Sequence, residues 1–243
     1  MDSRRDDTPR PTGILPLGDG AAYVEFSESL DLVVNDAVQR LAAALRARAV
    51  PWIRDVVPAL GGVALHFDPD HPALPPAPLH DVGMLVDECL RAGLSDVPDE
   101  SRTLEVPVCY EPEFALDLLE VAERVRLAPQ EVVRRHAAAE HRVLMVGFAP
   151  GHPYLGGLDP SLAVPRRAVP RASVPAGSIA IANQQTSVYP FAIPGGWNVI
   201  GRTPLVLFDA HRAQPSLFAP RDRVRFVPIS REQFERQSRK GRA

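Results

Sequence analysis

The first hundred residues show two hydrophobic periods, and together they predict a strand, a helix, two strands and a second helix. Apolar and polar side chains alternate in residues 21–26 and 63–67, as expected for half-buried strands. Residues 52–57 predict another strand. Apolar side chains recur every three to four positions in residues 31–48 and 79–92, which predicts two amphipathic helices.

A further alternating run, residues 103–110, has two possible places. It can complete a split β-α-β, ferredoxin-like unit as its last strand, or it can belong to a second domain. The polar segment 94–101, which contains a proline, is the best candidate for the boundary. We therefore predict a ferredoxin-like domain at residues 13–100, preceded by a charged, disordered tail at residues 1–12.

Beyond this boundary the pattern changes to short strands. Residues 113–126 and 129–141 predict two short helices, the second with a proline in its first turn. After them, glycine and proline separate short extended segments, which is typical of a β-barrel or sandwich. We predict an α+β chain with a barrel domain at residues 101–230 and a basic C-terminal tail at residues 231–243, a frayed helix or solvated segment. The strands expected in the barrel are residues 143–148, 178–182, 189–193, 204–208 and 223–228.

Composition excludes several classes of function. The 243 residues carry a net charge of -3, so no strong field would recruit nucleic acid or an anionic membrane. Lys240 is the single lysine among 27 basic residues, which excludes a P-loop ATPase, pyridoxal phosphate chemistry and a biotin carrier. No apolar segment of a secretory signal follows the N-terminus, so a cytoplasmic protein is expected.

Histidine and cysteine positions do not predict a metal site. His136 and His141 lie five positions apart, about 140 degrees around a helix, so their rings cannot share one ion. We expect one of the two rings to face inward and the other outward. Cys89 and Cys109 lie in apolar patterns and are predicted to be small buried residues.

A long uncharged stretch, residues 172–201, is the most informative part of the chain. Its prolines and amides do not suit a membrane span, so it is expected inside the protein. Arginines bracket it, and aromatic, amide and hydroxyl side chains lie in and beside it, a set that suits a small amide or carboxylate ligand. Alternatively, the amides satisfy barrel backbone and the arginines cover the surface. The candidate binding residues are Tyr154, Arg166, Arg171, Gln185, Thr186, Tyr189, Trp197, Arg202 and Thr203. The glycines that would let backbone approach a ligand are Gly151, Gly195, Gly196 and Gly201.

Four motifs in the second half carry a family resemblance. They are G-F-A-P-G-H-P-Y-L-G-G-L (147–158), P-R-R-A-V-P-R-A-S-V-P-A-G-S-I-A-I-A (165–182), Q-T-S-V-Y-P (185–190) and P-G-G-W-N-V-I-G-R-T-P-L-V-L-F-D (194–209). They resemble the family of 5-oxoprolinase B subunits, which also contains allophanate hydrolase subunit 1 and sporulation kinase inhibitors, with a related segment in urea carboxylase. The resemblance implies a ferredoxin-like domain followed by a cyclophilin-like β-barrel.

The resemblance also implies an activity and partners. Family members act with the C and A subunits of 5-oxoprolinase to open 5-oxoproline to L-glutamate at the expense of ATP. The bracketing arginines would then bind carboxylate or phosphate, Gln185, Thr186 and Tyr189 would orient the lactam amide, and His136 is the candidate catalytic residue for proton transfer. We expect this chain to supply positioning and interface residues, with any ATP site shared across subunits. Two other functions stay open: inhibition of a sensor histidine kinase, and membership of a urea or allophanate hydrolase or carboxylase complex.

The chain departs from the family pattern at two places in the candidate site. The family has phenylalanine where this chain has His152, and Gly-Gly-x-Gln-Thr-Gly where residues 182–187 stand. An altered substrate and a divergent copy with the family's activity are both consistent with these changes.

Overall fold

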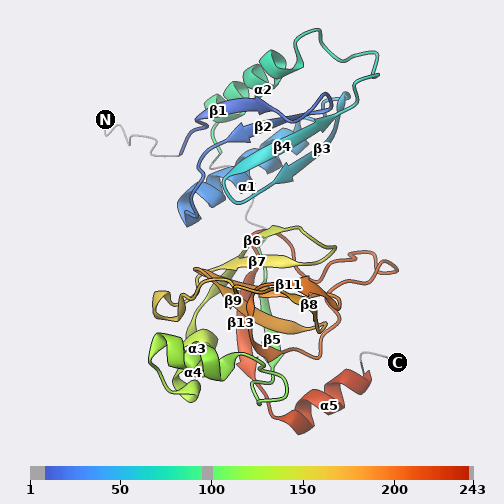
Figure 1. Cartoon of the computed structure of the whole chain (residues 1–243). Helices are drawn as coiled ribbons and strands as arrows, with labels where there is room; N and C mark the ends of the chain where they lie inside the picture. Colours follow the sequence, from blue (N-terminus) through green and yellow to red (C-terminus); the bar gives the residue numbers. More distant parts are fainter. Residues whose placement is uncertain (1–8, 95–100, 241–243) are drawn as a thin grey trace, which may run out of the picture. The chain divides into compact units, whose positions relative to one another are not determined.

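The computed structural model describes residues 9–94 and 101–240. The chain divides into two compact units, Met1–Glu100 and Ser101–Ala243, each with a hydrophobic core of its own (Figure 1). No helix within those residues has the length and apolar character needed to cross a bilayer.

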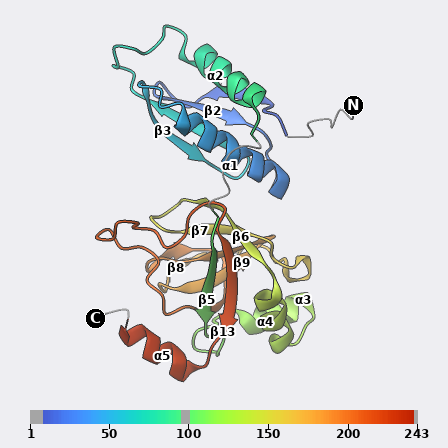
Figure 2. The same ribbon diagram turned by 180° about the vertical axis from the view of Figure 1, so that it is seen from behind.

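The first unit is an antiparallel sheet in the order β1-β2-β4-β3 with two helices on one face (Figure 2). Alternation along the strands sends Val63 and Leu65 to the helix-covered face, where they share a core with Leu41. The elements are β1 (Gly13–Pro16), β2 (Ala21–Glu25), α1 (Leu32–Ala47), β3 (Ile53–Pro58), β4 (Gly62–Phe67) and α2 (Pro78–Ala92). The predicted ferredoxin-like fold class is confirmed for this unit.

The run at residues 103–110 belongs to the second unit. It forms β5 (Thr103–Val108), which pairs in parallel with β13 (Arg223–Pro228) over its whole length. The edge position beside β2 is filled instead by β1, from the start of the chain. Of the two places predicted for this run, the one in the second domain is therefore correct.

The second unit is a seven-stranded barrel in the order β12-β9-β10-β7-β6-β13-β5. A backbone bridge between Cys109, just after β5, and Arg202, at the end of β12, joins the two edge strands, so the sheet is nearly closed. Cys109 and Cys89 are both buried, as predicted. The other barrel strands are β6 (His141–Val146), β7 (Pro153–Gly156), β9 (Ser178–Ala182), β10 (Gln185–Val188) and β12 (Asn198–Arg202).

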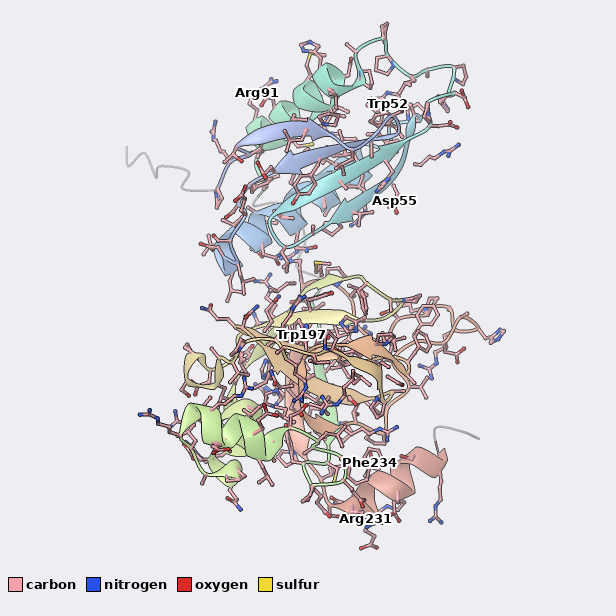
Figure 3. All side chains as sticks on the ribbon, viewed as in Figure 1. Trp52, Asp55, Arg91, Trp197, Arg231 and Phe234 are labelled. Atoms are coloured by element: carbon pink, nitrogen blue, oxygen red, sulfur yellow. The ribbon has the colours of Figure 1, made fainter. Side chains whose placement is uncertain are left out.

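Three helices pack against the barrel. The helices α3 (Leu118–Val125) and α4 (Pro129–Ala138) lie together on one side, and α5 (Arg231–Lys240) lies apart from them (Figure 1). Of the two alternatives predicted for this segment, the helix is confirmed and the solvated tail is wrong. Phe234, labelled in Figure 3, is buried. Its ring centroid lies 4.4 Å from that of Phe114.

Two of the predicted barrel strands are also wrong. Residues 204–208 form no strand, and only a single bridge from Phe208 to Ser216 lies there. Residues 189–193 do not form a barrel strand either, because β10 ends just before them, at Val188. The next strand, β11 (Ile193–Gly195), pairs with β8 (Arg171–Val174) rather than with a strand of the barrel. Prolines at the starts of these segments lack the N–H that a ladder requires.

The β8–β11 ribbon covers a second apolar cluster on the outside of the barrel. Residues of β9 alternate, so Ile179 and Ile181 join the barrel core while Ala180 and Ala182 face outward. We call this covered surface the outer face; its members are Tyr154, Val174, Ala180, Ala182, Tyr189, Ile193, Trp197 and Val199. Strand β9 is thus buried on both sides, which explains why this part of the stretch carries no charge.

Candidate functional site

Strand alternation along β10 separates the residues predicted to bind an amide. Thr186 pairs with Leu155 and Ile181, which are core residues, so its side chain lies inside the barrel. Gln185 and Ser187 pair with Ala182 and Ala180 and lie on the outer face. Gln185 and Thr186 therefore cannot act together on one ligand, and the predicted grouping with Tyr189 is corrected.

Thr186 belongs to a buried hydrogen-bonded group around His136. The Nδ1 atom of His136 lies 2.9 Å from Tyr110 Oη, its Nε2 atom lies 3.3 Å from Thr186 Oγ1, and its ring stacks on Phe226. The ring has no exposed surface, and burial lowers the pKa of His136 well below its usual range. A neutral imidazole whose two nitrogens are both hydrogen-bonded inside the core is poorly placed for the proton transfer predicted for His136.

His141 also differs from expectation. The helix α4 ends at Ala138, so His141 begins β6 and its ring turns inward, with its centroid 4.9 Å from that of His136. Its Nε2 atom lies 3.1 Å from the His136 carbonyl oxygen, and burial lowers its pKa to about 4. Both rings are therefore inside, whereas the sequence predicted one inside and one outside.

The carboxylate of Asp117 forms ion pairs with two of the arginines near the uncharged stretch. Arg171 binds it through two nitrogens, at 2.6 and 2.8 Å, and Arg167 Nη1 lies 2.7 Å from Asp117 Oδ1. The backbone N–H of Val199 donates to the same group, and Arg167 also contacts Glu120. Arg171 thus fixes the start of β8 to the loop before α3, and a role for it in binding carboxylate or phosphate is not favoured.

Arg202 and Thr203 stabilise the turn before β9. Arg202 Nε donates to the carbonyl oxygen of Ala176, and its backbone closes the barrel against Cys109. Thr203 donates its backbone N–H to the oxygen of Gly177, and its hydroxyl accepts from Leu205 N. These contacts give both residues a structural role at this turn.

The four glycines allow close approach within the chain itself. At Gly201 an added Cβ would lie 2.7 Å from Val108 Cγ1, so glycine is required where β12 meets the end of β5. Gly151 has φ +75 and packs against Phe208. Gly195 packs on the Tyr189 hydroxyl, and Gly196 meets only ordinary contacts near Pro170.

The outer face brings together most of the remaining candidates. The ring of His152 lies edge-on to Tyr154 and Tyr189, with centroids 5.2 and 5.1 Å away, and Tyr154 lies 5.9 Å from Trp197. The exposed guanidinium of Arg166 lies 5.9 Å from the Trp197 ring centroid, a cation–π contact. Burial raises the pKa of both tyrosines, so their hydroxyls stay protonated at neutral pH.

Two polar atoms in this region are buried without a hydrogen-bond partner among the described residues. They are Gln185 Nε2, a donor, and His152 Nδ1. Buried polar groups in proteins are nearly always paired, so such atoms mark places where a ligand or water can complete the site. His152 and Ser187 are not among the predicted site residues. The sequence feature that could have pointed to them is that both differ from the family motif.

The outer face therefore suits a small ligand that carries a neutral hydrogen-bonding group and, at one end, an acidic group. Aromatic rings would hold its apolar part, a buried amide donor and an imidazole would meet its polar atoms, and Arg166 would meet an anion at the edge. The described ranges, 9–94 and 101–240, contain no cluster of three or more histidine, cysteine or acidic residues that could hold a metal ion.

A ferredoxin-like unit followed by a nearly closed barrel is the architecture of a carboxyltransferase-type domain. Residues 12–218 match the family described as "Carboxyltransferase domain, subdomain C and D", and the chain belongs to this family. It is a homologue of the B subunit of 5-oxoprolinase: it is 40% identical over 223 residues to that protein from Bacillus subtilis (strain 168), covering 90% of this chain and 93% of the relative. The corresponding protein from Escherichia coli O157:H7 is 38% identical, with 87% and 94% covered.

Solved structures agree on the fold. The crystal structure of TTHA0988 is 36% identical with a TM-score of 0.72; it matches 86% of this chain, which spans only 39% of that longer protein. The conserved uncharacterized protein PH0987 from Pyrococcus horikoshii is 35% identical with a TM-score of 0.54, and 91% and 99% of the two chains are covered. The K. lactis urea amidolyase, at 21% identity and a TM-score of 0.67, shares the fold.

Proposed function

We propose that this chain is the B subunit of an ATP-dependent 5-oxoprolinase, and that the outer face of its barrel holds the lactam substrate. The observation that carries the proposal is the 40% identity to the Bacillus subtilis protein over 93% of that protein's length. The outer face supports it, because 5-oxoproline is a small lactam with one carboxylate, and the face offers aromatic walls, an amide donor and a guanidinium.

Three residues of the site have distinct roles in this proposal. Arg166 binds the carboxylate, since its guanidinium is exposed at the edge of the face. Gln185 donates from Nε2 to the lactam carbonyl oxygen, and Trp197 packs against the ring. These groups bind and orient the substrate, and none of them is a nucleophile.

The remainder of the reaction is assigned to the partner C and A subunits. The chain has one lysine, Lys240, so it lacks the lysine of a P-loop. ATP is therefore expected to bind chiefly to a partner, and this chain alone is expected to be inactive.

The test is to mix this chain with candidate C and A subunits and to measure ADP and glutamate. We expect both products to form in equal amounts from 5-oxoproline, and only when all three chains are present. Urea and allophanate serve as control substrates in the same mixture. Release of ADP with either of these but not with 5-oxoproline would contradict the proposal, as would capture of a sensor histidine kinase without the C subunit.

A further inference from the structure

The hydrogen bonds of Ser187 fix the tautomer of His152. Ser187 Oγ lies 2.8 Å from the carbonyl oxygen of Pro153 and 2.8 Å from His152 Nε2. The carbonyl cannot donate, so the single hydroxyl proton goes to Pro153, and Ser187 Oγ must accept from His152 Nε2–H. The imidazole is neutral at pH 7, because burial lowers its pKa to about 4. The other nitrogen, Nδ1, is then a lone-pair acceptor.

This acceptor is buried and has no donor. His152 is 3% exposed, and its Nδ1 atom has no hydrogen-bond partner among the residues that the structure describes. The neighbouring rings, those of Phe148, Tyr154 and Tyr189, stand edge-on to the imidazole at 5.1 to 5.5 Å. A buried acceptor without a donor is unfavourable in the free protein, and a ligand N–H or O–H would relieve it.

One of these neighbours, Phe148, has a strained backbone and a side chain at the surface. Phe148, in the loop between β6 and β7, has φ +71, which is rare for a non-glycine residue, and its side chain is 70% exposed. Strain of this kind clusters at ligand sites. His152 therefore lies one surface side chain away from solvent.

We propose that His152 Nδ1 accepts a hydrogen bond from the N–H of the bound substrate, so that this site selects a secondary amide or lactam over an isostere without the N–H. The identity of the ligand rests on the proposed function. A lactam presents its N–H and C=O on the same side of the ring, and so needs an acceptor and a donor together. Strand β10 carries Gln185 and Ser187, the hydrogen-bond partner of His152, on one face, and Gln185 Nε2 and His152 Nδ1 are the unpaired donor and acceptor there. Arg166, beside Trp197, would meet the carboxylate.

The test compares the KM for 5-oxoproline with the inhibition constant of 3-oxocyclopentane-1-carboxylate in the reconstituted three-chain enzyme. In this ketone a CH2 group replaces the N–H, while the carbonyl and carboxylate keep their places. We expect wild-type enzyme to bind the ketone about tenfold more weakly than the lactam. His152→Phe keeps an aromatic ring against Tyr154 and Tyr189; it should raise KM about tenfold and leave the inhibition constant unchanged, so that the preference disappears.

A second substitution covers the case in which His152→Phe fails to assemble. Ser187→Ala removes the group that fixes the tautomer and should reduce the preference several-fold, whereas Ser173→Ala, an exposed serine on β8, should leave it unchanged. A preference equal to that of wild type in His152→Phe or Ser187→Ala, with turnover retained, overturns this inference alone. Absence of 5-oxoproline turnover in the wild-type mixture overturns the proposed function and this inference with it.

Discussion

Replacing Asp117 with alanine is expected to lower the free energy of unfolding of the second unit by about 3 kcal/mol. The carboxylate is buried and accepts hydrogen bonds from Arg167, Arg171 and the backbone of Val199. Its removal takes this acceptor from Arg171 and from the N–H of Val199, and leaves Arg167 with Glu120 alone; both guanidinium groups are only a quarter exposed. This loss of unfolding free energy is at the lower end of the range for breaking a buried ion pair, because water can still reach both guanidinium groups.

Urea unfolding followed by tryptophan fluorescence measures this change. Trp52 belongs to the first unit and Trp197 to the second, so a Trp52→Phe background makes Trp197 the reporter of the barrel (Figure 3). Glu120→Ala is the matched control, since it removes a half-exposed partner of the same Arg167 and should cost under about 1 kcal/mol. Equal losses in the two variants would show that the Asp117 carboxylate is not the centre of this ion-pair network.

Acid is expected to destabilise the barrel at pH values well above those at which carboxylates titrate. Burial lowers the pKa of His141 and His152 to about 4, and it also lowers that of His136 well below its usual range. The unfolded chain binds protons near pH 6.5, while the native barrel does not, so the stability due to neutral histidine is complete above pH 6.5 and is lost as pH falls toward 4. His141 and His152 each contribute about 2 kcal/mol of this loss by pH 5, and His136 adds to it.

The measurement is the unfolding free energy of the barrel at pH 7 and at pH 5, again through Trp197. We expect a steep fall, and the His152→Phe variant should reduce the fall by about 2 kcal/mol because one proton fewer is taken up on unfolding. The arginine-paired carboxyl of Glu131, with a pKa of about 2, protonates only below this window. A free energy that does not change between pH 7 and pH 5 would contradict the buried, neutral state of these histidines.

Local periodicity predicted most elements of the first unit. The helices α1 and α2 lie within one or two residues of the predicted ranges, because each presents one continuous apolar stripe to the sheet. Strand β1 was missed, since Gly13–Pro16 is a half-exposed edge with no clear alternation. The place of β5 was left open, because its partner β13 lies more than a hundred residues further along the chain.

The site was predicted less well, because composition does not show which side of a strand a residue faces. Gln185 and Thr186 are adjacent in sequence, yet one lies on the outer face and the other in the core with His136. Arg171 was expected to meet a ligand, but its partner Asp117 is 54 residues away and no local pattern reveals the pair. Two of the residues that depart from the family motif, His152 and Ser187, are hydrogen-bonded to each other.

The claim that the outer face binds the substrate is tested most directly by comparing Gln185→Leu with Gln184→Leu in the reconstituted enzyme. Gln185 Nε2 is a buried donor without a protein partner among the described residues, whereas the neighbouring Gln184 is exposed. Gln185→Leu should raise the KM for 5-oxoproline about tenfold, with stability unchanged or slightly higher because an unpaired donor is removed. Gln184→Leu should change neither quantity, and a KM for Gln185→Leu equal to that of wild type would contradict the account.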